Sequence, residues 1–193
     1  MAGYGANNIR WGKLVSDADA SKLPTYEPAL SMGPLTSVTD SVTFASGENH
    51  GSDELQDFIE EFVKIDVDVV STDIPEAASV AFLGLTKGED GILHFNKDDD
   101  PPYGGVGFIA RRGRKLSDNT YKKYFRVMIY PMVKGRRSNV SAGTKTGSIS
   151  FTNDNAHFTG KTCASGDYVA QQDFETMAAA LAFLDSVLPL AKA

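Results

Sequence analysis

The hydrophobic positions between residues 103 and 151 fall into three runs that predict strands, and the rest of the chain is organised around this stretch. Residues 106–110, 121–133 and 147–152 are rich in aromatic and β-branched side chains, which favour a pleated, half-buried strand surface. The segments 111–119 and 134–146, rich in glycine and arginine, would be the loops that connect these three strands. Because proline cannot donate to a strand ladder, Pro131 predicts an edge, a bulge or a strand end.

Further short runs predict strands at residues 9–15, 35–44, 62–71, 92–95 and 156–163. In residues 62–71, alternate positions are valine or isoleucine and the positions between them include charged residues, which is typical of a strand with one wet face. Residues 53–61 are ambiguous. Leu55, Phe58 and Ile59 have helical spacing with Phe62 and Val63, and Ser52 could cap such a helix.

Two segments predict helices. Residues 75–83 begin with Pro75 and are followed by Gly84, which suit the first position and the stop of a helix. Residues 173–188 carry an apolar stripe and a run of alanines, which favour a helix packed on the sheet or on a neighbouring subunit. The segments between the elements (16–34, 45–53 and 97–102) contain proline, glycine or consecutive aspartates and predict loops.

The tally of about eight strands and two helices predicts a mainly β (α+β) chain. The small, uncharged residues 1–8 predict a flexible N-terminal arm, followed by a β domain at 9–165 and a C-terminal helical extension at 166–193. A long strand with an edge, flanked by two long cationic loops, is a poor basis for a self-sufficient monomer. We therefore expect an assembly subunit.

Composition limits the alternatives. The chain has 193 residues, of which 41% are hydrophobic, enough for one domain with a sizeable core. Its single cysteine, Cys163, excludes an intrachain disulfide and a cysteine-rich zinc site. The first residues lack the apolar segment of a secretory signal, and no apolar run approaches the ~20 residues of a membrane span. We expect a protein made in the cytoplasm that makes no membrane contact.

The net charge of −6 is unevenly distributed along the chain. Residues 48–68 contain eight acidic residues against one lysine, and residues 111–137 contain ten basic residues against one aspartate. These segments could be two solvated faces, or the acidic patch of one molecule could meet the basic patch of another. Nucleic-acid binding is a weaker alternative because the whole chain is acidic. The candidate subunit-interface residues are Glu48, Asp53, Glu54, Asp57, Arg111, Arg112, Arg114, Lys115, Arg136 and Arg137.

Motifs for catalysis are not evident. Residues 143–147 lack the spacing of a phosphate-binding loop, and the glycines of residues 103–107 lead into a strand rather than out of one. The histidines His50, His94 and His157 are isolated in the sequence, and Cys163 is interpreted as a buried thiol. We expect no enzyme, metal or cofactor.

Several short motifs, in the same order and spacing, resemble the major tail protein (tail tube protein) of long-tailed, non-contractile bacteriophages. Residues 44–49 resemble its aromatic-Ala-Asp turn, with Ser46 in place of the usual acid. Residues 75–84 resemble its helix ending in Leu-Gly, and residues 91–93 the short strand that follows. Residues 100–103 resemble its Asp-x-Pro-Tyr segment, and Gly107-Phe108 resembles its Gly-Phe pair. Residues 144–151 resemble its Thr-Lys segment. The resemblance covers roughly residues 35–165.

This resemblance implies a β-sandwich or barrel flanked by a helix, six copies of which form a ring. Stacked rings would make the conduit for DNA ejection into the host, located in the virion tail. The implied partners are copies of itself, the tape measure, tail terminator and distal tail proteins, and DNA that passes through a lumen without specific binding. The alternative function is a monomeric β-sandwich that binds a host surface or carbohydrate, for which Tyr121, Tyr124 and Tyr130 are the only dense aromatic cluster.

Overall fold

The computed structural model describes residues 2–51, 54–88, 90–115, 117, 119–138 and 152–191, and it confirms a mainly β, sandwich-like fold. The described residues form two helices, α1 (Glu76–Leu83) and α2 (Met177–Val187). They also form eleven strands: β1 (Ala2–Ser16), β2 (Thr25–Tyr26), β3 (Leu30–Ser31), β4 (Leu35–Gly51), β5 (Glu54–Ser71), β6 (Thr86–Lys87), β7 (Leu93–His94), β8 (Tyr103–Lys115), β9 (Tyr121–Arg137), β10 (Asp154–Gly160) and β11 (Ala170–Phe174).

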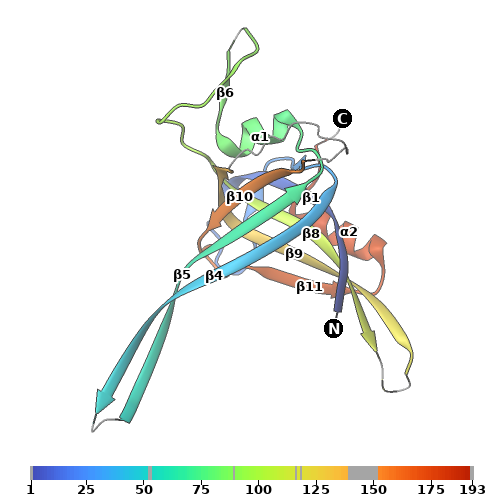
Figure 1. Ribbon diagram of the computed structural model, residues 1–193. Helices are drawn as coiled ribbons and strands as arrows, with labels where there is room; N and C mark the ends of the chain where they lie inside the picture. Colours follow the sequence, from blue (N-terminus) through green and yellow to red (C-terminus); the bar gives the residue numbers. More distant parts are fainter. Residues whose placement is uncertain are drawn as a thin grey trace, which may run out of the picture.

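Nine of the strands form one antiparallel sheet in the order β2-β1-β8-β9-β10-β5-β4, with β3 also paired to β1 and β11 to β9. The sheet curls, so that β4 and β5 cross in front of β8 and β9 in Figure 1 and β4 contacts β1. Strands β6 and β7 form a separate small hairpin. Two long hairpins, β4–β5 and β8–β9, extend beyond the body (Figure 1).

The main core lies between the two halves of the curled sheet. Its buried members include Trp11 of β1, Val106 of β8, Tyr130 of β9 and Ile65 of β5. Helix α1 adds Phe82, whose ring packs edge-on against Trp11 with centroids 6.4 Å apart and lies 5.2 Å from the ring of Phe158. The inward residues of both halves therefore share one apolar interior, as in sandwiches and small barrels.

Helix α2 covers the other face of β8 and β9. Ala180, Leu184 and Leu188 are buried against Ile109 and Ile129. The helix begins at Met177 after Thr176, whose side chain accepts a hydrogen bond from the Ala179 N–H, a typical N-cap. The predicted apolar stripe at the C-terminus therefore packs on the chain's own sheet.

Local signals in the sequence located several elements correctly. Pro75 precedes α1, and Gly84 ends it in the left-handed conformation with φ of 65°, where glycine lacks the steric cost of a side chain. At Pro131 the pairing of β8 with β9 shifts, so that Pro131 and Met132 lie opposite Gly105. This is the bulge that Pro131 predicted.

Other boundaries differ from the sequence-based expectation. Residues 2–8 are the first half of β1 and pair with β8, so they form no separate arm here. The ambiguous segment 53–61 is strand from Glu54 onward, and residues 45–51 continue β4 rather than forming a loop. The predicted loops 111–119 and 134–146 begin as strand, because β8 reaches Lys115 and β9 reaches Arg137.

The C-terminal part also differs. Residues 173 and 174 end β11 instead of starting a helix, and β11 pairs with β9, so residues 166–191 are part of the same sheet and core. Of the predicted strand 147–152, all but residue 152 lies outside the described residues. In the part of the chain that the structure covers, neither helix has the length and apolar character needed to cross a membrane.

Candidate assembly surfaces

The β4–β5 hairpin leaves the body as a two-stranded ribbon, which we define as residues 44–51 and 54–64. The two strands pair along their whole length, from Leu35↔Ser71 to Gly51↔Glu54. Strand β10 covers β5 only from Ile65 to Ser71, and no described strand pairs with the other edge of β4. Both edges of the ribbon therefore carry backbone groups that a further strand could pair with.

The ribbon carries apolar side chains that no core covers. Phe44 is 46% exposed, Phe58 48%, Ile59 60% and Val63 52%. Exposed Glu60 and Glu61 lie among them. Because side chains alternate between the faces of a strand, Phe44 and Phe58 share one face of the ribbon and Ile59 lies on the other. Exposed apolar side chains among acidic ones are typical of a protein–protein contact. The sequence pattern did not predict this surface, because it left residues 53–61 open between a helix and a strand.

Aromatic rings fix the ribbon where it leaves the body. Phe62 stacks on Tyr168 with ring centroids 4.6 Å apart and contacts Phe44, its cross-strand partner, edge-on at 6.2 Å. The register shifts at the same place, where Thr43 pairs with Lys64 but Phe44 pairs with Phe62. Such a bulge bends and twists its strand, so the stack and the bulge together set the direction of the ribbon.

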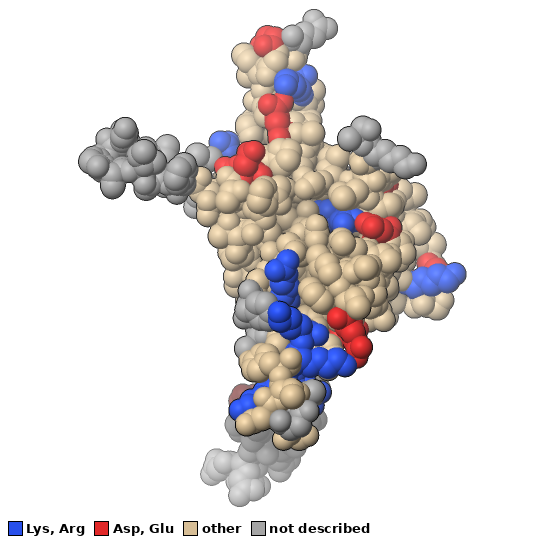
Figure 2. Space-filling model, turned by 90° about the vertical axis from the view of Figure 1, so that its right-hand side faces the viewer, with Lys and Arg blue, Asp and Glu red and all other residues tan. Residues whose placement is uncertain are grey.

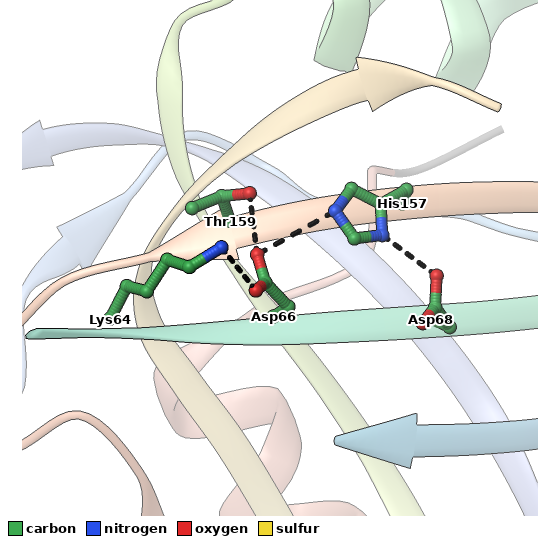
Figure 3. Close-up of polar contacts among 5 residues, drawn as sticks. All are labelled: Lys64, Asp66, Asp68, His157 and Thr159. Atoms are coloured by element: carbon green, nitrogen blue, oxygen red, sulfur yellow. Dashed lines mark hydrogen bonds and ion pairs between the residues drawn. The ribbon is translucent and has the colours of Figure 1, made fainter. Parts of the chain in front are cut away.

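A polar ladder lies beside the root of the ribbon on β5 and β10 (Figure 3). Asp68 accepts from the His157 ring at 2.7 Å, and Asp66 accepts from the Thr159 hydroxyl at 2.8 Å and pairs with Lys64 at 2.6 Å. Burial raises the pKa of Asp66, but the hydrogen bonds from Lys64 and Thr159 outweigh it and leave the pKa below its usual range. The pairs His157–Asp68 and Thr159–Asp66 are cross-strand and hold β10 to β5, whereas Lys64–Asp66 lies within β5.

The β8–β9 hairpin is basic. Figure 2 shows Lys and Arg side chains gathered along the part of the molecule that leads to its tip. The set comprises Arg111, Arg112, Arg114, Lys115, Lys122 and Lys123. Near the tip, Lys122 pairs with Glu175 at 2.5 Å. Towards the body, Arg126 binds both carboxylate oxygens of Asp173 at 2.6 Å. The hydrogen bond from Arg126 holds the pKa of Asp173 below its usual range.

Arg136 and Arg137 lie at the other end of β9. They pair with His157 and Ala156 of β10, and the Arg137 guanidinium lies 4.2 Å from the centroid of the Phe95 ring. At about 3.3 Å per strand residue, Arg137 is roughly 50 Å along the strand from Tyr121. The basic segment 111–137 is therefore two separate cationic surfaces.

The described acidic candidates, in contrast, belong to one hairpin. Glu48 lies on β4, and Glu54 and Asp57 lie on the facing stretch of β5. Asp53 lies outside the described residues, between the two strands. The structure thus brings the three described acidic candidates together on the ribbon and divides the basic ones.

The histidines, Cys163 and a tyrosine cluster are the candidates for a site of another kind that the sequence offers. Within them, no three His, Cys, Asp or Glu side chains are placed to hold a metal ion. Cys163 is buried, and its thiol lies 3.1 Å from both the Ser165 hydroxyl and the Asp167 carbonyl oxygen. Tyr130 is only 1% exposed, so the tyrosine cluster at 121, 124 and 130 does not form one surface.

Two comparisons with known proteins do not assign the chain to a family. A scan of the sequence against protein-family models found no match, and a search of curated proteins found no significant similarity.

Proposed function

We propose that this protein is a structural subunit that joins copies of itself into rings and a tube, of the kind that forms bacteriophage tail tubes. The observation that carries the proposal is the ribbon, whose two edges have no further strand partner among the described residues. In a monomer such an edge is a liability for uncontrolled pairing, whereas closure into a ring covers it.

The exposed apolar side chains support the same proposal. Phe44, Phe58 and Ile59 are each between 46% and 60% exposed, although burying one such side chain contributes about 1.5–3 kcal/mol. A neighbouring copy that covered them would gain this free energy on association. The ribbon is therefore suited to a contact between subunits rather than to solvent.

The charges favour contacts between unlike surfaces. The ribbon is acidic and the β8–β9 hairpin and the Arg136–Arg137 end of β9 are basic. Because like surfaces repel and unlike surfaces attract, this arrangement favours contacts in which the ribbon of one copy meets a basic surface of another, as in head-to-tail contacts. Head-to-tail contacts close into rings and also stack into filaments.

On this proposal the protein is located in the virion tail. Its other partners are the tape measure, tail terminator and distal tail proteins, and DNA passes through the lumen without specific binding. A net charge of −6 per subunit fits a conduit for DNA, because it disfavours adhesion of phosphates.

Sedimentation velocity tests the proposal. The wild-type chain is expected to form species larger than a dimer as its concentration rises from micromolar to millimolar. Replacing Phe58 and Ile59 by serine is expected to shift assembly to at least tenfold higher concentration, while the circular-dichroism spectrum stays unchanged. Replacement of exposed Val15 (63% exposed) by serine serves as a control for general loss of apolar surface.

A wild-type chain that stays monomeric across this range, also when initiating tail proteins are added, would contradict the proposal. Equal effects of the ribbon and Val15 variants would contradict the role of the ribbon.

A further inference from the structure

A cationic groove lies beside the root of the ribbon. It has a volume of about 530 Å³ and is lined by β5, β9, β10 and the segment before β8. Four cationic side chains and one acid contribute to it: Lys64, Lys134, Arg136, Lys161 and Asp100. The groove begins where β10 ends, next to Gly160, and where β5 loses its second strand partner.

Tyr103 organises the cations of the groove. The ammonium groups of Lys134 and Lys161 lie 4.7 and 4.6 Å from the centroid of its ring, which are cation–π distances. Lys134 also pairs with Asp100 at 2.8 Å. Two cations are thus held on one aromatic ring, and among the described residues no carboxylate forms an ion pair with Lys161.

The groove also has apolar walls. Tyr103, Pro101 and the half-exposed Val63 line it together with the cations. A ligand that fits would therefore present carboxylates next to apolar side chains. The ribbon has this composition, since exposed Glu60 and Glu61 follow Phe58 and Ile59 directly.

We propose that this groove receives the acidic ribbon of a second copy of the chain, with Glu60 and Glu61 placed against Lys161 and Arg136. The inference rests on the proposed function and specifies which surface accepts the ribbon. The root residues Val63 and Lys64 line the groove of their own chain. The rest of the ribbon leads away from the body in Figure 1 and cannot reach that groove. The contact is therefore between unlike surfaces of neighbouring copies, which is the type that closes rings.

Two other contacts match less well: the ribbon with the basic β8–β9 hairpin, and the groove with a nucleic acid. The basic hairpin offers charge, but Lys122 near its tip and Arg126 nearer the body already pair with Glu175 and Asp173. Among its described residues, Tyr121 is the only strongly exposed large apolar side chain. A nucleic acid would bring phosphates rather than apolar groups, and the net charge of −6 opposes it.

Cysteine cross-linking between copies tests the proposal, because Cys163 is buried and is expected to stay silent. Equal amounts of a Glu60→Cys chain and a Lys161→Cys chain are mixed at a concentration at which the wild type assembles, and then oxidised. Disulfide-linked heterodimer is expected from this pair, at least tenfold above the yield from Glu60→Cys with Arg114→Cys on the basic hairpin.

Charge reversal provides a second measurement. Arg136→Glu with Lys161→Glu is expected to raise the assembly concentration at least tenfold, and mixing this variant with a Glu60→Lys, Glu61→Lys chain is expected to restore assembly in part. Lys22→Glu with Lys97→Glu, at two exposed loop positions, is the matched control with the same change of charge. Thermal unfolding of each variant shows whether the fold is retained.

The outcomes separate the two proposals. If the wild type assembles but cross-links through Arg114, or if only reversal of Arg111 and Arg114 impairs assembly, the groove proposal is wrong and the tube proposal stands. Retention of a double-stranded DNA probe that is lost on reversal of Arg136 and Lys161 would assign the groove to nucleic acid instead. If the wild type never assembles, both proposals fail.

Discussion

Phe62 of the ribbon root stacks on Tyr168, with ring centroids 4.6 Å apart and the ring planes inclined by 14°. The two residues belong to strand β5 and to the turn between β10 and β11. Their contact joins the ribbon to the body at the point where β5 loses its pairing with β10. Stacked aromatic pairs contribute about 0.5–1.5 kcal/mol beyond the area they bury, enough to favour one direction of the ribbon over others.

Replacing Tyr168 by alanine is therefore expected to loosen the ribbon without unfolding the body. The free energy of unfolding should fall by no more than about 2 kcal/mol, whereas the assembly concentration should rise several-fold because an unfixed ribbon loses more conformational entropy on docking. Hydrogen exchange of the ribbon amides, compared with that of the β8 amides, measures how far the ribbon is loosened. Tyr168→Phe, which keeps the ring, is the control, and equal assembly of the alanine and phenylalanine variants would contradict this role.

Gly135 of β9 lets helix α1 approach the sheet. A Cβ atom at this position would lie 2.5 Å from the Phe82 carbonyl oxygen, which belongs to the backbone and cannot move without the helix. Gly135→Ala is expected to destabilise the fold by about 1–3 kcal/mol, the usual cost of overpacking. Gly47→Ala, where nothing lies within 4 Å of the added atom, is the matched control in urea denaturation. Equal midpoints for the two variants would contradict the close packing of α1.

Arg10 ties strand β1 to helix α2. Its side chain is 2% exposed, and one guanidinium nitrogen donates to the Asp185 carboxylate at 2.5 Å and to the Leu188 carbonyl at 2.9 Å. Asp185→Ala leaves this buried cation with one neutral acceptor, and is expected to cost about 1.5–3 kcal/mol.

Arg10→Met combined with Asp185→Ala should recover much of that loss, because an apolar side chain of similar length needs no charge partner. Urea denaturation of the single and double variants measures the coupling, and strictly additive effects would contradict it.

The pair of Arg126 and Asp173 predicts a dependence of stability on pH. The hydrogen bond from Arg126 lowers the pKa of Asp173 below its ordinary value of 3.8. The folded state therefore binds this proton less readily than the unfolded state, so the stabilisation is fully present above about pH 5 and is lost as the pH falls through the folded-state pKa.

The unfolding free energy of wild type and Asp173→Asn, measured from pH 7 to pH 2, should differ at neutral pH and converge in acid. A difference that stays constant over this range would contradict the assignment.

Local signals explain what the sequence predicted correctly. The alternation at Ile65, Val67 and Val69 indicated a strand with one buried face, and all three are fully buried in the core. Pro75 and Gly84 marked the ends of α1 because each has a backbone requirement of its own. These signals depend only on neighbouring residues.

Pairing between distant segments explains what the sequence did not predict. Phe58 and Ile59 have helical spacing, but β4 supplies a partner for each of them, so the strand forms instead. Residues 2–8 look unstructured by composition and are ordered by pairing with β8. For the candidate site, the acidic residues could be grouped from the sequence because they lie on one hairpin. The division of the basic residues follows from the length of β9, which extends to Arg137. The sequence predicts that this strand ends at residue 133 and places Arg136 and Arg137 in a loop.

Negative-stain electron microscopy of the purified chain, at concentrations up to the millimolar range, tests self-assembly through the ribbon most directly. A variant in which residues 45–61 are replaced by a two-residue Asn-Gly turn, which then connects the paired Phe44 and Phe62, removes the outer ribbon but leaves the pairing of β4 with β5 in the body. The wild type is expected to show rings or tubes, and the shortened variant only single particles of the folded chain. Single particles from both, or rings from both, would contradict the account.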